Sequence, residues 1–287
     1  MNNLKYLIQF LIIIFFLILF KLLGLRISSI LSGYLTKTFG PFFRSNNLAR
    51  KNLVRAMPNL NSYQQKRLLE KMWFNYGKIL SEYIFIKNFR THPSFSEKIK
   101  IINRNIIEKI KADEQPVIFI SGHFNNFELM AMQIEKLGIN LSVVYRPLNN
   151  IFLNPVMEHI RKKFICKNQI KKRISGTKLL LKHFKKKNSI ALMIDQRVSE
   201  GIKVDLFKAK SFTTTIPAQF VKKFNAKIVP VYIERTYNDN FEITFFEPIT
   251  FEKDSTIYDI TLILNQKLEK MILKNPDQWT WTHNKWK

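Results

Sequence analysis

The sequence lacks the features on which several common classes of function depend. It contains one cysteine, Cys166, which excludes an internal disulfide framework and is compatible with a reducing compartment. No Gly-x-Gly-x-x-Gly or Walker-type loop is present, which argues against nucleotide binding. The five histidines are widely scattered along the chain: His92, His123, His159, His183 and His283. No Cys/His cluster resembles a metal site, so neither a metal nor another cofactor is expected.

Acidic residues are also scarce. The 21 Asp and Glu stand against 47 Lys and Arg, which gives a formal net charge of +26. Such a charge favours phosphate-bearing or acidic partners: anionic lipid surfaces, nucleic acid or acidic carrier proteins. Hydrophobic residues make up 46% of the chain, which excludes a disordered protein. At 287 residues the chain is long enough to bury a sizeable core.

One long apolar run is present, at the N-terminus. It extends from Tyr6 to Phe20 and resumes after Lys21. With Lys5 and Lys21 reaching out of the membrane, it is near the ~20 residues that a bilayer core requires, though at the short end. A cleavable signal peptide is the alternative, but no small-x-small cleavage site follows. Basic residues concentrate after the run, so the positive-inside rule places the body on the cytoplasmic side. Residues 1–27 are therefore expected to be an uncleaved membrane anchor.

The remaining residues, 28–287, are expected to form one domain, mainly helical in 28–112 and α/β in 113–287. Asn61 or Ser62 can cap a helix that runs towards Tyr83, although Gly77 lies inside it. Beyond Pro116, strands and helices alternate, which predicts a mostly parallel central sheet flanked by helices. The expected strands are Val117–Ile120, Leu141–Tyr145, Ile190–Ile194, Lys203–Phe207, Ile228–Ile233 and Phe241–Phe246. The expected helices are Asn126–Leu137, Asn154–Phe164, Ser175–Lys185, Ile216–Phe224 and Ile257–Leu273.

The stretch Pro116–Glu128 carries the first candidate site. A buried strand leads into Ser121-Gly122, and a helical pattern follows, so His123 is expected at the mouth of a strand-to-helix turn. In one continuous helix, His123 and Glu128 would lie about 140° apart. They meet only if His123 stays in the turn while Glu128 begins the helix. The alternative is structural: Asn125-x-x-Glu128 fits a capping box, which would leave His123 an ordinary loop histidine.

Two other polar residues follow predicted strands. Arg146 comes after Leu141–Tyr145 and is expected beside His123, where arginine suits a phosphate, a carboxylate or a developing oxyanion. A salt bridge at the rim explains its position equally well. Asp195 follows Ile190–Ile194 and belongs to the same sheet edge, where it either caps a turn or helps to shape the site.

These motifs, in this order, resemble those of the lysophospholipid-acyltransferase superfamily, and within it the lipid A biosynthesis late acyltransferases (lauroyl/myristoyl transferases). His123 and Glu128 match the family's His-x-x-x-x-Asp/Glu motif, with Asn125 and Phe127 where the usual version has glycine and tryptophan. Lys208 also replaces an expected glycine. Further blocks match over nearly the whole chain: Arg50–Leu53, Tyr145–Asn150, Arg173–Gly176, Asp195–Gln196, Gly201–Phe207, Thr213–Ala218 and Gln278–Trp286.

The resemblance implies transfer of a fatty acyl chain from an acyl-carrier-protein thioester to a hydroxyl of a Kdo-bearing lipid A precursor. His123 would act as general base and Glu128 would orient its imidazole. Arg146, and in second place Arg173, would bind phosphate or support the oxyanion. The expected partners are acyl carrier protein, a phosphorylated glycolipid and anionic membrane lipids, with no nucleic acid. The expected location is the cytoplasmic face of a bacterial inner membrane.

Two alternatives remain open from the sequence. The chain could acylate another hydroxylated lipid, such as a lysophospholipid or an aminolipid. It could instead be a non-enzymatic, membrane-tethered binder of polyanions, although that function leaves the buried-strand position of His123 unexplained.

Overall fold

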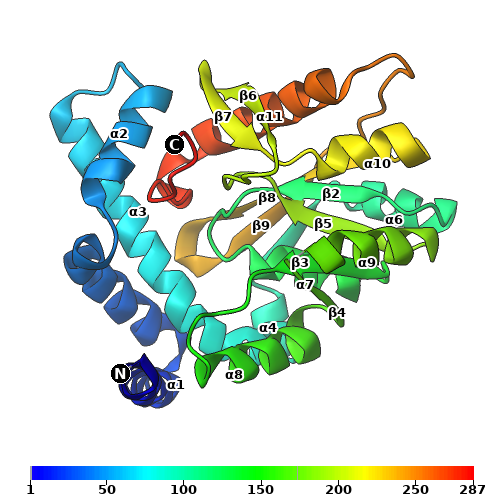
Figure 1. Ribbon diagram of the computed structural model, residues 1–287. Coiled ribbons are helices and arrows are strands. Elements are labelled where there is room, and N and C mark those ends of the chain that lie inside the picture. The colour runs from blue at the N-terminus through cyan, green and yellow to red at the C-terminus, as the bar shows by residue number, and fades with distance from the viewer. Residues whose placement is uncertain (1, 173) are drawn as a thin grey trace.

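A computed structural model describes residues 2–172 and 174–287. A seven-stranded sheet lies at its centre, in the order β1-β9-β8-β2-β5-β3-β4, with helices packed around it (Figure 1). The strands are β1 Ile99–Ile102, β2 Ile118–Ser121, β3 Leu141–Tyr145, β4 Asn168–Lys171, β5 Ser189–Met193, β6 Ile202–Leu206, β7 Ala209–Thr213, β8 Ile228–Arg235 and β9 Phe241–Phe245. The predicted fold class, a mostly parallel sheet with flanking helices and a long apolar N-terminal helix, is confirmed.

Helices make up the N-terminal part of the chain, and further helices pack against the faces of the sheet (Figure 1). They are α1 Asn2–Phe43, α2 Asn46–Ala56, α3 Ser62–Glu82, α4 Ile86–Thr91, α5 Pro93–Ser96, α6 Arg104–Asp113, α7 Glu128–Lys136, α8 Leu153–Ile160, α9 Ile174–Lys185, α10 Ile216–Phe224 and α11 Ile257–Lys274. The remaining helical elements are short turns: η1 Tyr83–Phe85, η2 Arg161–Ile165, η3 Tyr237–Asp239 and η4 Pro276–Gln278.

The centre of the sheet is parallel and fully buried. β2 pairs with β5 on one side and β8 on the other, both parallel, and every residue of β2 and β8 is buried. β9 runs antiparallel to β8 because the short turn η3 joins them as a hairpin, whereas parallel neighbours need a long crossover. The carboxyl ends of β2, β5 and β3 therefore share one edge of the sheet.

The placement of one predicted strand was wrong. The segment predicted as Lys203–Phe207 does not join the main sheet: β6 pairs with β7 in a separate antiparallel hairpin. Phe207 and Lys208 form its turn, with φ of 52° and 58°. Two successive positive φ angles characterise a tight hairpin turn and favour glycine, which explains why glycine is expected at position 208. Nothing in the structure explains the lysine that stands there.

Strands β1, β4 and β7 were not predicted. β1 and β4 are four-residue strands at the two edges of the sheet, and each is partly exposed. Edge strands carry polar and charged residues, as Lys100 and Lys171 do here, so their apolar alternation is weak.

The N-terminal helices pack closely on one another. Asn61, one of the two caps that the sequence predicted, is the N-cap of α3 and forms a capping box with Gln64; the helix continues unbroken through Gly77. Gly77 faces α1: a Cβ at this position would lie 2.3 Å from the Ser32 carbonyl oxygen. The Ser32 hydroxyl donates to the Gly77 carbonyl at 2.7 Å. Glycine is required here because the two helix backbones touch.

Replacing Gly77 with alanine is expected to lower the free energy of unfolding by ~1–3 kcal/mol, because the added methyl group forces α1 and α3 apart. Thermal unfolding in detergent, followed by circular dichroism, measures the change. The sign of the change in the free energy of unfolding decides the question. At an uncrowded helix position, the same substitution would stabilise the protein by about 0.5–1 kcal/mol through helix propensity alone. A gain of stability in Gly77→Ala would show that α1 and α3 can move apart freely.

Candidate active site

His123 and Asp195 come together because two parallel strands are in register. β2 and β5 pair Ser121 with Met193, and each strand continues by two residues to reach His123 and Asp195. Both residues therefore follow the ends of their strands at the same level along the strand direction, at the same edge of the sheet. The backbone bond from Ile194 N–H to the Ser121 carbonyl, 2.9 Å, extends the pairing to this point.

The Asp195 carboxylate holds the imidazole of His123 firmly. One oxygen, Oδ1, lies 2.7 Å from His123 Nδ1. The other, Oδ2, accepts from the His123 backbone N–H at 2.8 Å and from Trp279 Nε1–H at 2.9 Å. The Asp195 side chain is 4% exposed, whereas that of His123 is 24% exposed. The arrangement fixes Nδ1 and leaves Nε2 without a charged partner among the described residues; the Gln196 amide lies 3.4 Å from it.

Within the pair, each residue shifts the pKa of the other. Burial opposes protonation of His123, but the Asp195 carboxylate outweighs it, and the pKa of His123 is raised above its ordinary value. For Asp195, burial favours the neutral acid, yet the imidazole and the N–H donors bring its pKa well below the ordinary range. Asp195 is therefore ionised at neutral pH. A neutral His123 donates Nδ1–H to it and keeps Nε2 free as a proton acceptor.

The structure pairs Glu128 with residues other than His123. Its Oε1 accepts from Arg161 at 2.9 Å (Nε) and 2.8 Å (Nη2), and from the Tyr83 hydroxyl at 3.2 Å. The expected hydrogen bond from Glu128 to the imidazole is thus replaced by the bond from Asp195. The capping-box alternative is also not found: α7 begins at Glu128 itself, and its N-cap, Phe127, makes no side-chain cap.

Arg161 and Tyr83 were not singled out from the sequence. Arg161 is the first residue of a basic run, Arg161-Lys162-Lys163, and the pattern gave no sign that it differs from the other two. The π-helical turn η2 directs its guanidinium inward, where it also lies over the Tyr145 ring at 5.8 Å. Its side chain is 15% exposed, while Lys162 and Lys163 remain exposed. The Tyr83 hydroxyl has a pKa well above its ordinary value, because burial and the Glu128 charge disfavour the phenolate.

Arg146 does not join this cluster. Arg146 follows β3, and β5 lies between β3 and β2, so Asp195 rather than Arg146 is the direct neighbour of His123. The Arg146 side chain is exposed and forms no ion pair with any described residue. Arg173 lies outside the described residues. Nor do any three His, Cys, Asp or Glu side chains of the described chain gather as a metal site.

The similarity to a known family extends over the whole polypeptide. All 287 residues, 1–287, match the family described as bacterial lipid A biosynthesis acyltransferase. The chain belongs to this acyltransferase family. Comparison with curated proteins gave no match. Family membership makes the chain an enzyme of lipid A biosynthesis, and it removes the non-enzymatic polyanion binder from consideration.

Two positions where this acyltransferase departs from the usual family motif now have structural roles. Asn125 has φ of 37°, in the region that favours glycine, and its amide donates to Gln278 Oε1. Phe127 places its ring edge-to-face against the His123 imidazole, with 4.7 Å between ring centroids. Both side chains thus help to shape the turn that carries His123.

The C-terminal segment of the acyltransferase packs against the residues that carry His123 and Asp195. Phe124 pairs with Trp279 in an isolated bridge, and Trp279 donates to Asp195. Lys285 is fully buried, and its ammonium lies within 3.1–3.2 Å of the carbonyl oxygens of Ile194, Gln196 and Phe212 and the Thr213 hydroxyl. Burial lowers the pKa of Lys285 to about 8, against the opposing pull of Asp195. Lys285 therefore ties the loop after β5 to the hairpin β6–β7.

Replacing Lys285 with methionine is expected to lower the free energy of unfolding by about 2–4 kcal/mol, because buried carbonyl groups lose their donor. Urea denaturation measures it. Lys287→Met is the matched control, since the Lys287 side chain is exposed in the same segment. Equal stability of the two variants would show that water replaces the ammonium.

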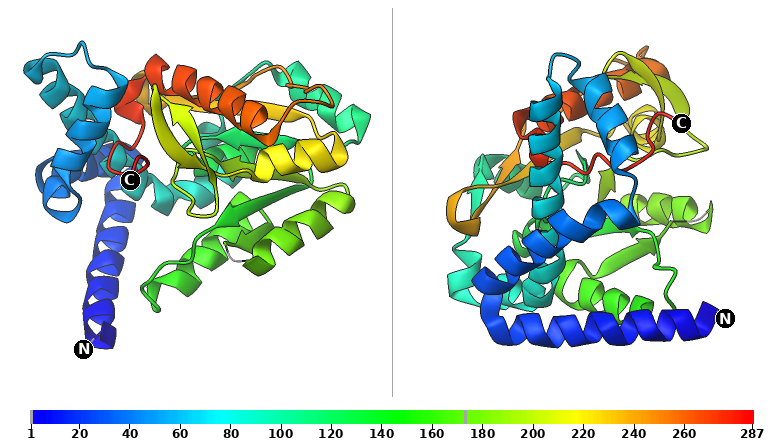
Figure 2. Two further views of the ribbon diagram at one scale, coloured as in Figure 1. Left: turned by 45° about the horizontal axis from the view of Figure 1, so that its top comes forward. Right: turned by 90° about the vertical axis from the view of Figure 1, so that its left-hand side faces the viewer.

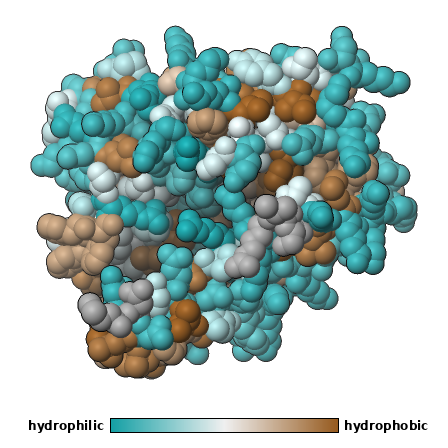
Figure 3. Space-filling view, viewed as in Figure 1, coloured by the Kyte–Doolittle hydropathy of each residue, from teal (hydrophilic) through white to brown (hydrophobic). Residues whose placement is uncertain are grey.

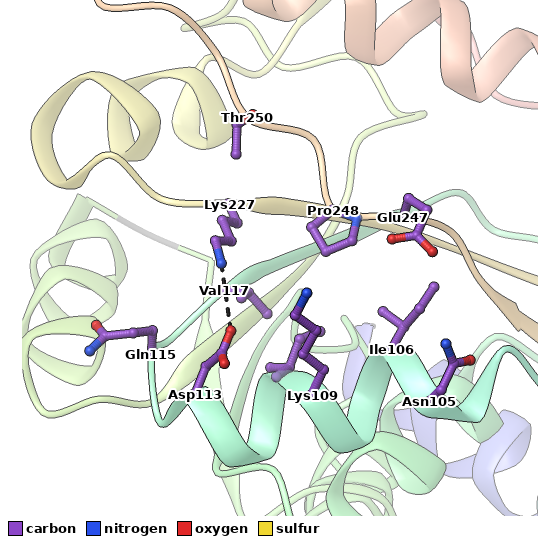
Figure 4. A pocket seen from close by; sticks show the side chains of 11 residues that line it. Asn105, Ile106, Lys109, Asp113, Gln115, Val117, Lys227, Glu247, Pro248 and Thr250 are labelled. Carbon is purple, nitrogen blue, oxygen red and sulfur yellow. Dashed lines mark ion pairs between the residues drawn. The ribbon is translucent and has the colours of Figure 1, made fainter.

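A separate hollow lies at the opposite end of the sheet (Figure 4). It has a volume of about 340 Å³ and is lined by α6, by Val117, which precedes β2, and by Lys227, which precedes β8. The Lys227–Asp113 ion pair, 3.6 Å, crosses it. Because it opens at the amino ends of the strands, it is remote from His123.

Proposed function

We propose that this acyltransferase moves a fatty acyl chain from an acyl-carrier-protein thioester to a hydroxyl of a Kdo-bearing lipid A precursor. The observation that supports the chemistry best is the pairing of His123 with Asp195, which leaves Nε2 accessible at the carboxyl edge of the sheet. A histidine oriented by a buried carboxylate is a recurrent general base in acyl transfer.

His123 Nε2 takes the proton from the acceptor hydroxyl as the oxygen attacks the thioester carbonyl. A C–O bond forms, the C–S bond breaks, and the proton passes from the imidazolium to the departing thiolate. Asp195 stabilises the imidazolium while it exists. No acyl-enzyme is required, because the acceptor itself is the nucleophile.

Glu128 acts through Arg161 in this proposal. Their two-bond pair, completed by the Tyr83 hydroxyl, holds a guanidinium near the start of α7. A fixed cation there suits an anionic group of the substrate or the developing oxyanion. Arg146 is exposed and unpaired among the described residues, so we retain it as a phosphate-binding residue.

The surroundings suit an anionic lipid and an acidic donor protein. The charge of +26 attracts both, and the apolar α1 provides attachment to a membrane. We place the enzyme at the cytoplasmic face of the inner membrane, where acyl carrier protein is accessible. Association with the carrier should weaken as salt rises, since it is steered by charge.

The test incubates the purified protein with labelled acyl carrier protein and one of two acceptors. With a Kdo-bearing tetra-acylated lipid A precursor, the product is expected to gain one acyl chain. With a lysophospholipid, no transfer is expected. Transfer confined to the lysophospholipid would replace the proposed acceptor, while leaving the His123 chemistry in place.

A further inference from the structure

The first part of α1, which ends at a kink at Gly24, is apolar between Lys5 and Lys21 except for Gln9. Gly24 has φ of 74° and ψ of 168°, so the helix changes direction there. Almost none of the preceding apolar stretch is buried, and Leu4, Leu11 and Phe15 are 57–65% exposed. So much exposed apolar surface must be covered by something outside the chain.

This part of α1 touches the body of the protein at both ends. Near its start, Asn150 Nδ2 donates to the Tyr6 carbonyl at 2.9 Å, and the rings of Phe10 and Phe152 lie 6.1 Å apart. Near its end, Phe20 is 6% exposed. In the right-hand view of Figure 2 the helix runs along the lower edge of the body, and in the left-hand view it extends downward from the other N-terminal helices.

These contacts conflict with a helix that crosses the bilayer. Tyr6 and Phe20 are 14 residues apart, or ~21 Å along a helix. If Tyr6 reached the far leaflet, the loop at Asn150 would have to follow it through the hydrocarbon. The exposed Lys162 and Lys163, on the turn directly after α8, would then lie at membrane depth, which is strongly unfavourable.

Lys5 and Lys21 bound the apolar stretch and are both exposed. They are 16 residues apart, or ~24 Å, so a crossing of the ~30 Å hydrocarbon core would require both side chains to reach outward to the headgroups. The contacts of α1 with the body, and not the length of the stretch, therefore argue against a crossing.

The loop that contacts α1 is itself apolar at its surface. Leu148, Ile151 and Phe152 are 36–54% exposed. Apolar side chains gather at the lower left of the space-filling view, where α1 lies in Figure 1 (Figure 3). The loop is therefore continuous with the outer face of α1.

We infer that α1 before Gly24, together with the loop 148–153, forms a docking surface for one leaflet of an anionic bilayer, and that α1 lies in that leaflet without crossing it. This inference does not depend on the proposed acyl transfer. An in-plane helix usually needs a polar face towards water. Here the inner face needs none, because Tyr6, Phe10, Ile13 and Leu17 are partly covered by the protein.

The experiment locates residue 3 relative to the body. Single cysteines are introduced as Asn3→Cys, at the exposed start of α1, and as Asp254→Cys, on the exposed body. The native Cys166 stays in place, because it is fully buried and burial raises the pKa of its thiol to about 12. Each protein is added to preformed vesicles of phosphatidylethanolamine and phosphatidylglycerol and treated with a membrane-impermeant maleimide. The parent chain measures any reaction of Cys166.

Both cysteines are expected to react from outside to the extent seen after detergent is added. Protection of Asn3→Cys until detergent opens the vesicles, with Asp254→Cys already labelled, would mean that α1 crosses the bilayer and would overturn the inference. The two outcomes are distinguishable even in a variant without enzymatic activity.

A second measurement tests the loop. An environment-sensitive fluorophore on Ile151→Cys is expected to shift to the blue and to be quenched by a shallow nitroxide lipid when vesicles are added. The matched control is Ile257→Cys, which is 37% exposed at the start of α11. Figure 1 shows α11 at the top of the molecule and α1 at its lower left. The emission of this control is expected to stay unchanged. An unshifted emission at position 151 would exclude the bilayer as the occupant of this surface.

Discussion

Replacing His123 with alanine is expected to lower kcat of acyl transfer by about 10³–10⁴-fold, the contribution of an oriented general base. The reason is geometric: Nε2 is the accessible atom of a ring whose other nitrogen is held by Asp195. The change should leave the fold intact, because the imidazole lies at the accessible edge of the sheet and not in its core. Acyl-transfer kinetics together with circular dichroism measure both effects.

His92→Ala is the control for this variant, since His92 is exposed at the α4–α5 corner and its ring forms a hydrogen bond with Ser94, far from the His123 site in sequence. Its activity is expected to equal that of the wild type. Undiminished activity of His123→Ala would exclude the general-base mechanism. Equal losses in both histidine variants would instead point to a general instability of the protein.

Asp195→Asn is expected to lower kcat by a comparable ~10³–10⁴-fold, because the amide disturbs the tautomer that leaves Nε2 free. It also removes the charge that raises the pKa of His123. A general base works when unprotonated, so wild-type activity should rise with pH through a pKa above the ordinary histidine value. In Asp195→Asn the pKa falls, and the remaining activity should reach its plateau at lower pH.

Glu128→Gln separates the two carboxylates. It leaves the His123–Asp195 bond untouched and weakens the pair with Arg161, so activity should fall with little displacement of the pH profile. A large displacement in Glu128→Gln, with none in Asp195→Asn, would show that Glu128 orients the imidazole after all. The kcat/KM profiles of the two variants therefore decide which carboxylate serves His123.

Several features of the site could be predicted from local sequence. The buried run before Ser121 placed His123 at the end of a strand, and the run Ile190–Ile194 placed Asp195 at the same edge. Both predictions rest on the fact that parallel strands buried on both faces are continuous apolar runs, followed by polar residues at their carboxyl ends. The family motif supplied Glu128.

Partner choice could not be predicted in this way. Glu128 was expected to hold His123 because the two are five residues apart, yet the order of strands brings Asp195, 72 residues away, to the imidazole. Strand order depends on the packing of the long crossover segments that connect parallel strands. The sequence of a single segment does not encode that packing. The pairing of Arg161 could not be predicted for a similar reason. Within one π-helical turn, the Arg161 guanidinium is directed inward while the two lysines of the same basic run are exposed.

The sequence by itself determined the fold class, the family, the apolar N-terminal helix and the edge of the sheet where chemistry occurs. Periodicity, strand-end residues and ordered motifs are local properties, so they can be recognised without knowledge of the tertiary structure. Only the tertiary structure decided that Asp195 orients towards His123 and that Arg161 pairs with Glu128. It alone showed that α1 touches the body at both ends. Each of these depends on contacts between distant segments, whose register and depth are set by packing of the whole chain.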